Sequence, residues 1–183
     1  MKIKVTDLKK QLKEYDQKEL IELIVEMYKT NKEIQNYLSS KFLGEEVIET
    51  LFLKARGKIE NEFFPNRGNA KLRLVEAKKE INAFKKATND EIRTVELMLF
   101  YVEQGIEFTC AYGDISENFY MSMEKMFDQV AMECDGNEEL YKHFSTRLHV
   151  VLSRANGSGW GFYEALMDSY YRIEWVHDED EDE

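Results

Sequence analysis

Residues 88–112 read TNDEIRTVELMLFYVEQGIEFTCAY, and this stretch decides the fold that the sequence predicts. Its apolar residues recur at steps of three and four, as they do along one face of a helix. The heptad-like line consists of Ile92, Val95, Leu99, Val102 and Ile106. Thr88 and Glu91 have the spacing of a capping box, so we predict a helix over about Asn89–Tyr112. Because this helix is apolar over most of its circumference, we expect it at the centre of the protein.

Helical patterns continue on both sides of this stretch. The other predicted helices begin after Thr6, at Asp16 with Glu19 as a capping box, near Lys32, after Gly44, near Asn69, at Ser116, at Asn137 and after the glycine-rich loop 157–161. The helix that begins near Asn69 is expected to run to Lys86. Short connections make successive helices antiparallel neighbours, and no stretch has the pattern of a strand. The sequence therefore predicts an all-α fold. We expect a single compact array of about eight or nine mostly antiparallel helices, either irregular or arranged as stacked helix hairpins.

The composition of the 183-residue chain agrees with a helical fold, and its charges are distributed unevenly along the sequence. One proline and nine glycines leave few turn residues for a β-sandwich or barrel. The net charge is −11, but residues 1–89 carry +5 and residues 90–183 carry −16. The last six residues are all acidic, so we predict one helical domain over residues 1–177 and a disordered acidic tail over 178–183. A chain this acidic has the wrong overall charge for a general nucleic-acid binder.

The spacing of the cysteines and the hydropathy of the sequence indicate the cellular compartment of the protein. Cys110 and Cys134 lie 24 residues apart, without the paired spacing of a disulfide scaffold, which favours a reducing environment. The first residues are too polar for a signal peptide, and no apolar run approaches the roughly 20 residues that span a bilayer. We therefore expect a cytoplasmic protein that does not enter a membrane.

Four stretches together resemble a known protein family. They are LKKQLKEYDQKELIELIVEMYK at residues 8–29, FFPNRGNAKLRLVEAKKEINAFKK at 63–86, ELMLFYVEQGIEFTCAYGDISENFYMSMEKMF at 96–127 and GSGWGFYEALMDSYYRI at 157–173. The chain resembles an uncharacterised family of small bacterial proteins, known as a domain of unknown function. This resemblance spans most of the chain and implies a bacterial, cytosolic, all-helical protein. It implies no catalytic residue, because no activity is established for that family.

A line of carboxylates along the central helix is the sharpest chemical pattern in the sequence. It consists of Glu96, Glu103, Glu107 and Asp114. Steps of seven, four and seven place these residues within about 40° of one another on a helix. Closely spaced carboxylates hold hard cations and raise one another's pKa, so the line suggests a metal-dependent or acid/base enzyme as one alternative. We favour the simpler interpretation, in which the line is the solvated edge of a mostly apolar helix.

A row of basic residues in segment 67–86 suggests a second alternative. The row consists of Arg67, Lys71, Lys78 and Lys85. On a continuous helix these residues lie within about 40° of one another, and they could hold an anion or follow the phosphates of a nucleic acid. The row lacks the interleaved aromatic residues that stack on bases, and the acidic second half would repel a polyanion. We therefore expect surface solvation or docking against acidic helices, with weak nucleic-acid binding as the alternative.

Aromatic residues near the C-terminal end suggest a surface for a protein partner. This set consists of Tyr163, Tyr170, Tyr171 and Trp175. Helical spacing makes core packing the default for such residues, although aromatic and methionine side chains also line partner grooves. We favour a non-enzymatic helical protein-interaction or regulatory protein. It would need no cofactor and would bind a protein partner or a second copy of itself.

Overall fold

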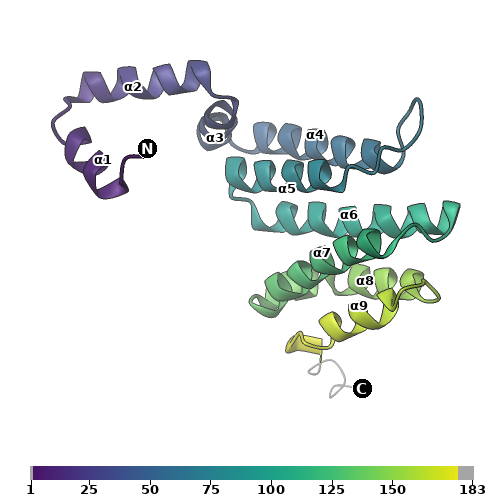
Figure 1. Cartoon of the computed structure of the whole chain (residues 1–183). Helices are drawn as coiled ribbons and strands as arrows, with labels where there is room; N and C mark the ends of the chain where they lie inside the picture. Colours follow the sequence, from purple (N-terminus) through teal and green to yellow (C-terminus); the bar gives the residue numbers. More distant parts are fainter. Residues whose placement is uncertain (1, 177–183) are drawn as a thin grey trace.

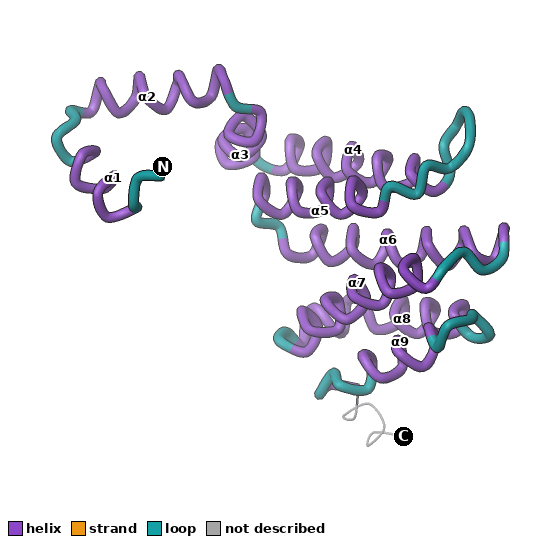
Figure 2. Tube along the Cα trace, in the orientation of Figure 1, coloured by secondary structure: helices purple, strands orange, loops and turns teal. Residues whose placement is uncertain are grey.

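The computed structural model describes residues 2–176, and over that range the protein is all-α, as predicted (Figure 2). The described residues form nine helices and no strand. The helices are α1 Val5–Leu12, α2 Gln17–Thr30, α3 Lys32–Leu43, α4 Glu45–Phe63, α5 Leu74–Thr88, α6 Glu91–Tyr112, α7 Glu117–Asp135, α8 Glu138–Ala155 and α9 Phe162–Tyr170. None of them is long and apolar enough to cross a membrane. The acidic tail predicted over residues 178–183 lies outside the described residues.

Helix α6 lies at the centre of a stack formed by α4 to α9, which confirms the expectation from its sequence (Figure 1). It packs against α4, α5, α7 and α8, and 13 of its 22 residues are buried. Tyr101 of α6 packs edge-on against Phe63 of α4, with ring centres 5.6 Å apart. Four residues of the heptad-like line are buried, whereas Ile92, in the first turn, is exposed.

Three predicted helix starts are confirmed. Asp16 and Glu19 form a capping box at the start of α2, in which each side chain accepts a hydrogen bond of 2.8 Å from the backbone N–H of the other. Ser116 caps α7, and Asn137 caps α8. In both, the side chain accepts from the backbone N–H three residues later, as polar N-cap residues generally do.

The start of α6 differs from the prediction. Thr88 is the last residue of α5, and Asp90 caps α6 by accepting a hydrogen bond of 2.9 Å from the N–H of Arg93. The chain reverses between the two helices through Asn89, which has a left-handed φ of 53°. Asparagine tolerates this conformation better than most residues. Because Asn89 is needed for this reversal, the N-cap of α6 is Asp90, two positions beyond Thr88.

The helix predicted from about Asn69 begins instead at Leu74. Glu62, near the end of α4, holds the preceding connection in an irregular path. Its carbonyl oxygen accepts hydrogen bonds from the N–H groups of Lys71 and Leu72, at 3.2 and 3.0 Å. Leu72 has a left-handed φ of 49°, which an α-helix of L-residues does not accommodate. The long-range contact with Glu62 therefore delays the start of α5.

Helices α1 and α2 extend away from the stack (Figure 1). Helix α2 packs against α3, which in turn lies against α4 and α5, whereas α1 packs against no other described helix to a comparable extent. Neither α1 nor α2 has a buried residue. We call residues 2–30 the N-terminal arm.

Candidate functional site

Two of the four carboxylates predicted to line the central helix bind an arginine. Glu103 accepts two hydrogen bonds from Arg147 of α8, with Nε 2.6 Å from Oε1 and Nη2 2.8 Å from Oε2. Glu96 lies 3.7 Å from the same guanidinium. Arg147 is partly buried, so the two carboxylates neutralise a cation that joins α6 to α8.

The other two carboxylates lie elsewhere. Glu107 is exposed, and Asp114 lies beyond the end of α6, where it accepts a hydrogen bond of 2.5 Å from the hydroxyl of Tyr120. Burial, together with the Asp114 carboxylate, raises the pKa of Tyr120 to about 12, so this hydroxyl remains a donor. Within residues 2–176, no three acidic, histidine or cysteine side chains lie close enough together to hold a metal ion. The fold thus separates the predicted ligands.

The predicted basic row is also divided. Arg67 and Lys71 precede α5, so they do not continue the face of that helix. Lys85 pairs with Glu133 of α7, with Nζ 3.0 Å from Oε1. Lys78 is partly buried and reaches across to α7. The four side chains therefore do not form one basic surface.

The predicted aromatic surface is mostly part of the core. Tyr170 is buried, and its hydroxyl lies 2.8 Å from Nε2 of His149. Trp175 is partly buried and donates from Nε1 to a backbone carbonyl of α7 at 3.0 Å. Tyr163 packs against the core, whereas Tyr171 is exposed. Three of the four residues thus lie in the core or pack against it, as is usual for aromatic residues at helical spacing.

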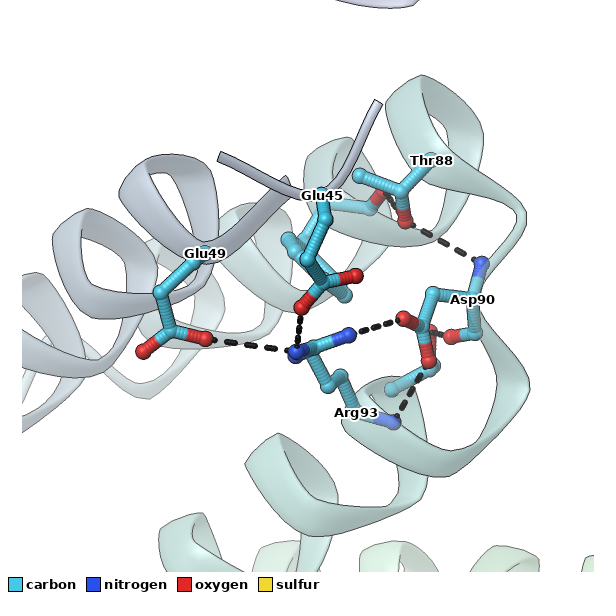
Figure 3. A network of polar contacts seen from close by, with 7 residues as sticks. Glu45, Glu49, Thr88, Asp90 and Arg93 are labelled. Atoms are coloured by element: carbon cyan, nitrogen blue, oxygen red, sulfur yellow. Dashed lines mark hydrogen bonds and ion pairs between the residues drawn. The ribbon is translucent and has the colours of Figure 1, made fainter. Parts of the chain in front are cut away.

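A polar network ties the start of α6 to α4 (Figure 3). The guanidinium of Arg93 forms ion pairs with Glu45, with Glu49 at 3.4 Å and with Asp90 at 2.7 Å. The hydrogen bonds that Arg93 donates to Asp90 and Glu45 raise its pKa above its already high ordinary value, although burial opposes them. Three carboxylates therefore neutralise this partly buried cation, and the network is structural.

The N-terminal arm carries an unusual density of exposed apolar side chains. Nine of the 22 large apolar side chains that are exposed in the described residues lie within residues 2–30. They are Ile3, Val5, Leu8, Tyr15, Ile21, Ile24, Val25, Met27 and Tyr28. Isolated exposed apolar residues are ordinary, but a gathered set indicates an interaction surface. The arm is therefore the candidate functional site.

The apolar stripe on α2 is wider than its contact with α3 requires. Its apolar residues cover about 200° of the helix circumference, from Leu23 round to Val25. A surface helix with one buried face has a stripe of about 100°. Helix α2 packs against α3, yet Ile21 and Ile24 are still 53% and 45% exposed. Part of this stripe thus stays exposed after α2 has packed against α3.

A comparison with family models matches residues 3–174. The matching model is described as a family of unknown function (DUF6155). The chain belongs to this family. The match includes the N-terminal arm as well as the stack, so the arm is part of the DUF6155 pattern. No curated protein and no solved structure matches the chain.

The sequence of this DUF6155 member contains a signal for the exposed arm beyond the helical spacing of its apolar residues. Apolar residues such as Leu20 and Ile24 at helical spacing are equally expected of a helix inside a bundle. The distinguishing feature is the width of the stripe, because Ile21 and Val25 extend it to one side. That width could have indicated two packing partners for α2 before the structure was known.

Proposed function

We propose that the protein is a non-enzymatic interaction protein that assembles with a second copy of itself through the N-terminal arm. The observation that carries this proposal is that two amphipathic helices, α1 and α2, have no buried residue. Helices of 8 and 14 residues are marginal in water by themselves and gain stability mainly by packing an apolar face. We therefore expect the arm to complete its packing against another polypeptide.

The charges of the arm favour a second copy as that polypeptide. Residues 1–30 contain seven lysines and six acidic residues, a net of +1, which leaves −12 on the rest of the chain. Two arms can meet with little like-charge repulsion, whereas contact between the acidic parts of two copies is disfavoured. Both signs of charge occur along the length of the arm, where Lys18 lies 3.9 Å from Glu22.

A symmetric pairing of two arms would bury the same apolar residues on each copy. Two α1–α2 pairs supply four amphipathic helices, the number that forms a simple helical bundle. The adjoining helix α3 adds Tyr37 and Phe42, which are 45% and 75% exposed. The proposed interface thus consists of the arm with exposed residues of α3 beside it.

Sedimentation equilibrium of the full chain tests this proposal. We expect a monomer–dimer equilibrium at concentrations of about 10–100 µM, which corresponds to an association free energy of several kcal/mol. Ile24→Glu replaces an apolar side chain of the α2 stripe with a charge. A loss of about 1.5 kcal/mol per copy, or about 3 kcal/mol per dimer, weakens the dimer about 100-fold.

Val150→Glu is the matched control. Val150 is 49% exposed, close to the 45% of Ile24, but it lies on α8 outside the arm. This variant should dimerise like the unaltered chain. The proposal is wrong if the unaltered chain stays monomeric over the whole concentration range. It is also wrong if Ile24→Glu leaves the dimer unchanged or weakens it no more than Val150→Glu does.

We also propose that the protein is cytoplasmic, of bacterial origin, and active without a cofactor. The free thiols of Cys110 and Cys134 support a reducing compartment. Burial raises the pKa of the Cys134 thiol to about 12, which makes it a poor nucleophile and supports a non-enzymatic role. Immunodetection in fractions of the native cells tests the location, and recovery with the membrane or outside the cell would contradict it.

A further inference from the structure

A cavity of about 540 Å³ lies between α5, α6 and α7. This volume is within the range of roughly 300–1,000 Å³ that is typical of small-molecule sites. Its apolar lining consists of the buried side chains of Ile81, Met98 and Met126 and the exposed side chain of Met132. Methionine side chains are flexible and polarisable, so they adapt to apolar ligands of different shapes. The rest of the lining is polar or charged, so the cavity can hold a small molecule that has both an apolar body and a polar group.

Lys78 also lines this cavity. Its ammonium group donates a hydrogen bond of 2.9 Å to Oγ of Ser122, which lies 2.8 Å from the hydroxyl of the buried Tyr101. Among residues 2–176, no carboxylate forms an ion pair with Lys78, and none contributes to its pKa. The hydroxyl of Ser122 accepts a hydrogen bond but does not neutralise the charge.

The absence of a described counter-ion sets Lys78 apart from the partly buried arginines. Arg93 pairs with three carboxylates, and Arg147 contacts two. Removing a charge from water without a counter-ion is unfavourable. Accordingly, burial, with a smaller contribution from Lys125, lowers the pKa of Lys78 below its ordinary value. An anion in the cavity would supply the opposite charge that the fold provides for the arginines.

We infer that this cavity binds a small organic monoanion with an apolar body, of which an aliphatic carboxylate is the simplest example. The carboxylate pairs with the ammonium of Lys78, and the apolar body packs against Met98 and Met126. Lys85 and Glu133 line the same cavity and pair with each other, so Lys78 is the charge in the lining that a ligand with a single negative charge would balance. No residue of the N-terminal arm lines the cavity, so this inference is independent of the proposed dimer.

Isothermal titration calorimetry of the full chain with octanoate tests the inference. We expect saturable binding with one ligand per chain, and much weaker binding of octanol, which has the same apolar body without the charge. Lys78→Gln should weaken octanoate binding at least tenfold, because it removes the charged partner. Lys86→Gln is the matched control, since it removes one charge from an exposed position on the same helix. It should change the dissociation constant less than twofold.

A second variant keeps the test valid if Lys78→Gln disturbs the fold. Met132 lines the cavity and is 66% exposed, so Met132→Glu adds a negative charge there with little effect on packing. This variant should also bind octanoate at least tenfold more weakly and retain the melting temperature of the unaltered chain. The inference is overturned if octanoate does not bind, if octanol binds equally well, or if neither variant weakens binding more than Lys86→Gln does.

Discussion

The contact between Glu62 and Arg73 holds the connection that leads into α5, and its contribution to the free energy of unfolding can be tested. The carboxylate of Glu62 is 6% exposed and accepts three hydrogen bonds from Arg73. One comes from the backbone N–H at 3.1 Å, one from Nε at 3.1 Å and one from Nη2 at 2.6 Å. Glu62→Gln keeps the size of the side chain but removes its charge. We expect this substitution to destabilise the protein by loosening the connection between α4 and α5.

The expected loss is about 2 kcal/mol in the free energy of unfolding. Each hydrogen bond to a charged group contributes about 1.5–3 kcal/mol, and two of the three come from the guanidinium. We take a value below the sum of these contributions because the Arg73 side chain is 54% exposed and can be rehydrated. For a protein of this size, that loss corresponds to a fall in melting temperature of about 4–8 °C.

The pH dependence of the effect has a defined sign. The hydrogen bond from the Arg73 side chain lowers the pKa of Glu62 in the folded state, although burial opposes it. The stabilisation is therefore fully present above the ordinary pKa of glutamate, and it is lost as pH falls through the lower folded-state pKa. The difference between the unaltered chain and Glu62→Gln should be largest near neutral pH and shrink below about pH 4.

Urea denaturation followed by circular dichroism measures this difference at both pH values. Glu60→Gln is the control, because Glu60 is an exposed glutamate on the same helix. The double variant with Arg73→Gln should be little less stable than Glu62→Gln alone, since the two residues act as a pair. Equal stability of Glu62→Gln and Glu60→Gln at neutral pH would refute the reasoning, as would a deficit that persists unchanged in acid.

Three further substitutions test the packing, the cap and the lysine. Gly105→Ala should lower the melting temperature in calorimetry by a net effect of about 1 kcal/mol, because the added Cβ would lie 2.3 Å from Sδ of the buried Met123. An unchanged melting temperature would show that Met123 moves aside freely. Asp90→Ala should cost about 1–2 kcal/mol in urea denaturation by removing the cap of α6 and an ion pair with Arg93, while Asp90→Asn should recover the part due to the cap. Equal losses in both variants would contradict a capping role. Lys78→Met should leave the free energy of unfolding unchanged or raise it, because it removes a partly buried charge that has no described carboxylate partner. A clear loss of stability would show that the lysine serves the fold.

The sequence was most informative where structure depends on neighbours in the chain. The capping box of Asp16 with Glu19, and the caps at Ser116 and Asn137, each join residues three positions apart. The central place of α6 follows from its wide apolar surface. These features could be predicted because spacing along a helix fixes which side chains share a face.

Prediction was less successful where a distant residue decides the outcome. Helical spacing placed Glu96, Glu103 and Glu107 on one face, but the position of Arg147 on α8 determines which of them is paired. Similarly, the basic row assumed a helix from Asn69, which the contact between Glu62 and the chain before Leu74 prevents. The residues next to these side chains in the sequence do not indicate which distant residue each of them will contact.

By itself, then, the sequence determined an all-helical fold and most of its helix starts, because these depend on residues a few positions apart. It also determined the division of charge between the two halves, which needs only the composition of each half. Only the tertiary structure showed that the N-terminal arm has no buried residue and that Lys78 lines a cavity without a carboxylate partner among the described residues. The physical reason is that an amphipathic pattern specifies that one face of a helix will be buried, but not which molecule will cover it. In the same way, a partly buried lysine specifies that its charge will be balanced, but not which molecule carries the opposite charge. Both proposals concern partners that this chain does not supply from its own described residues.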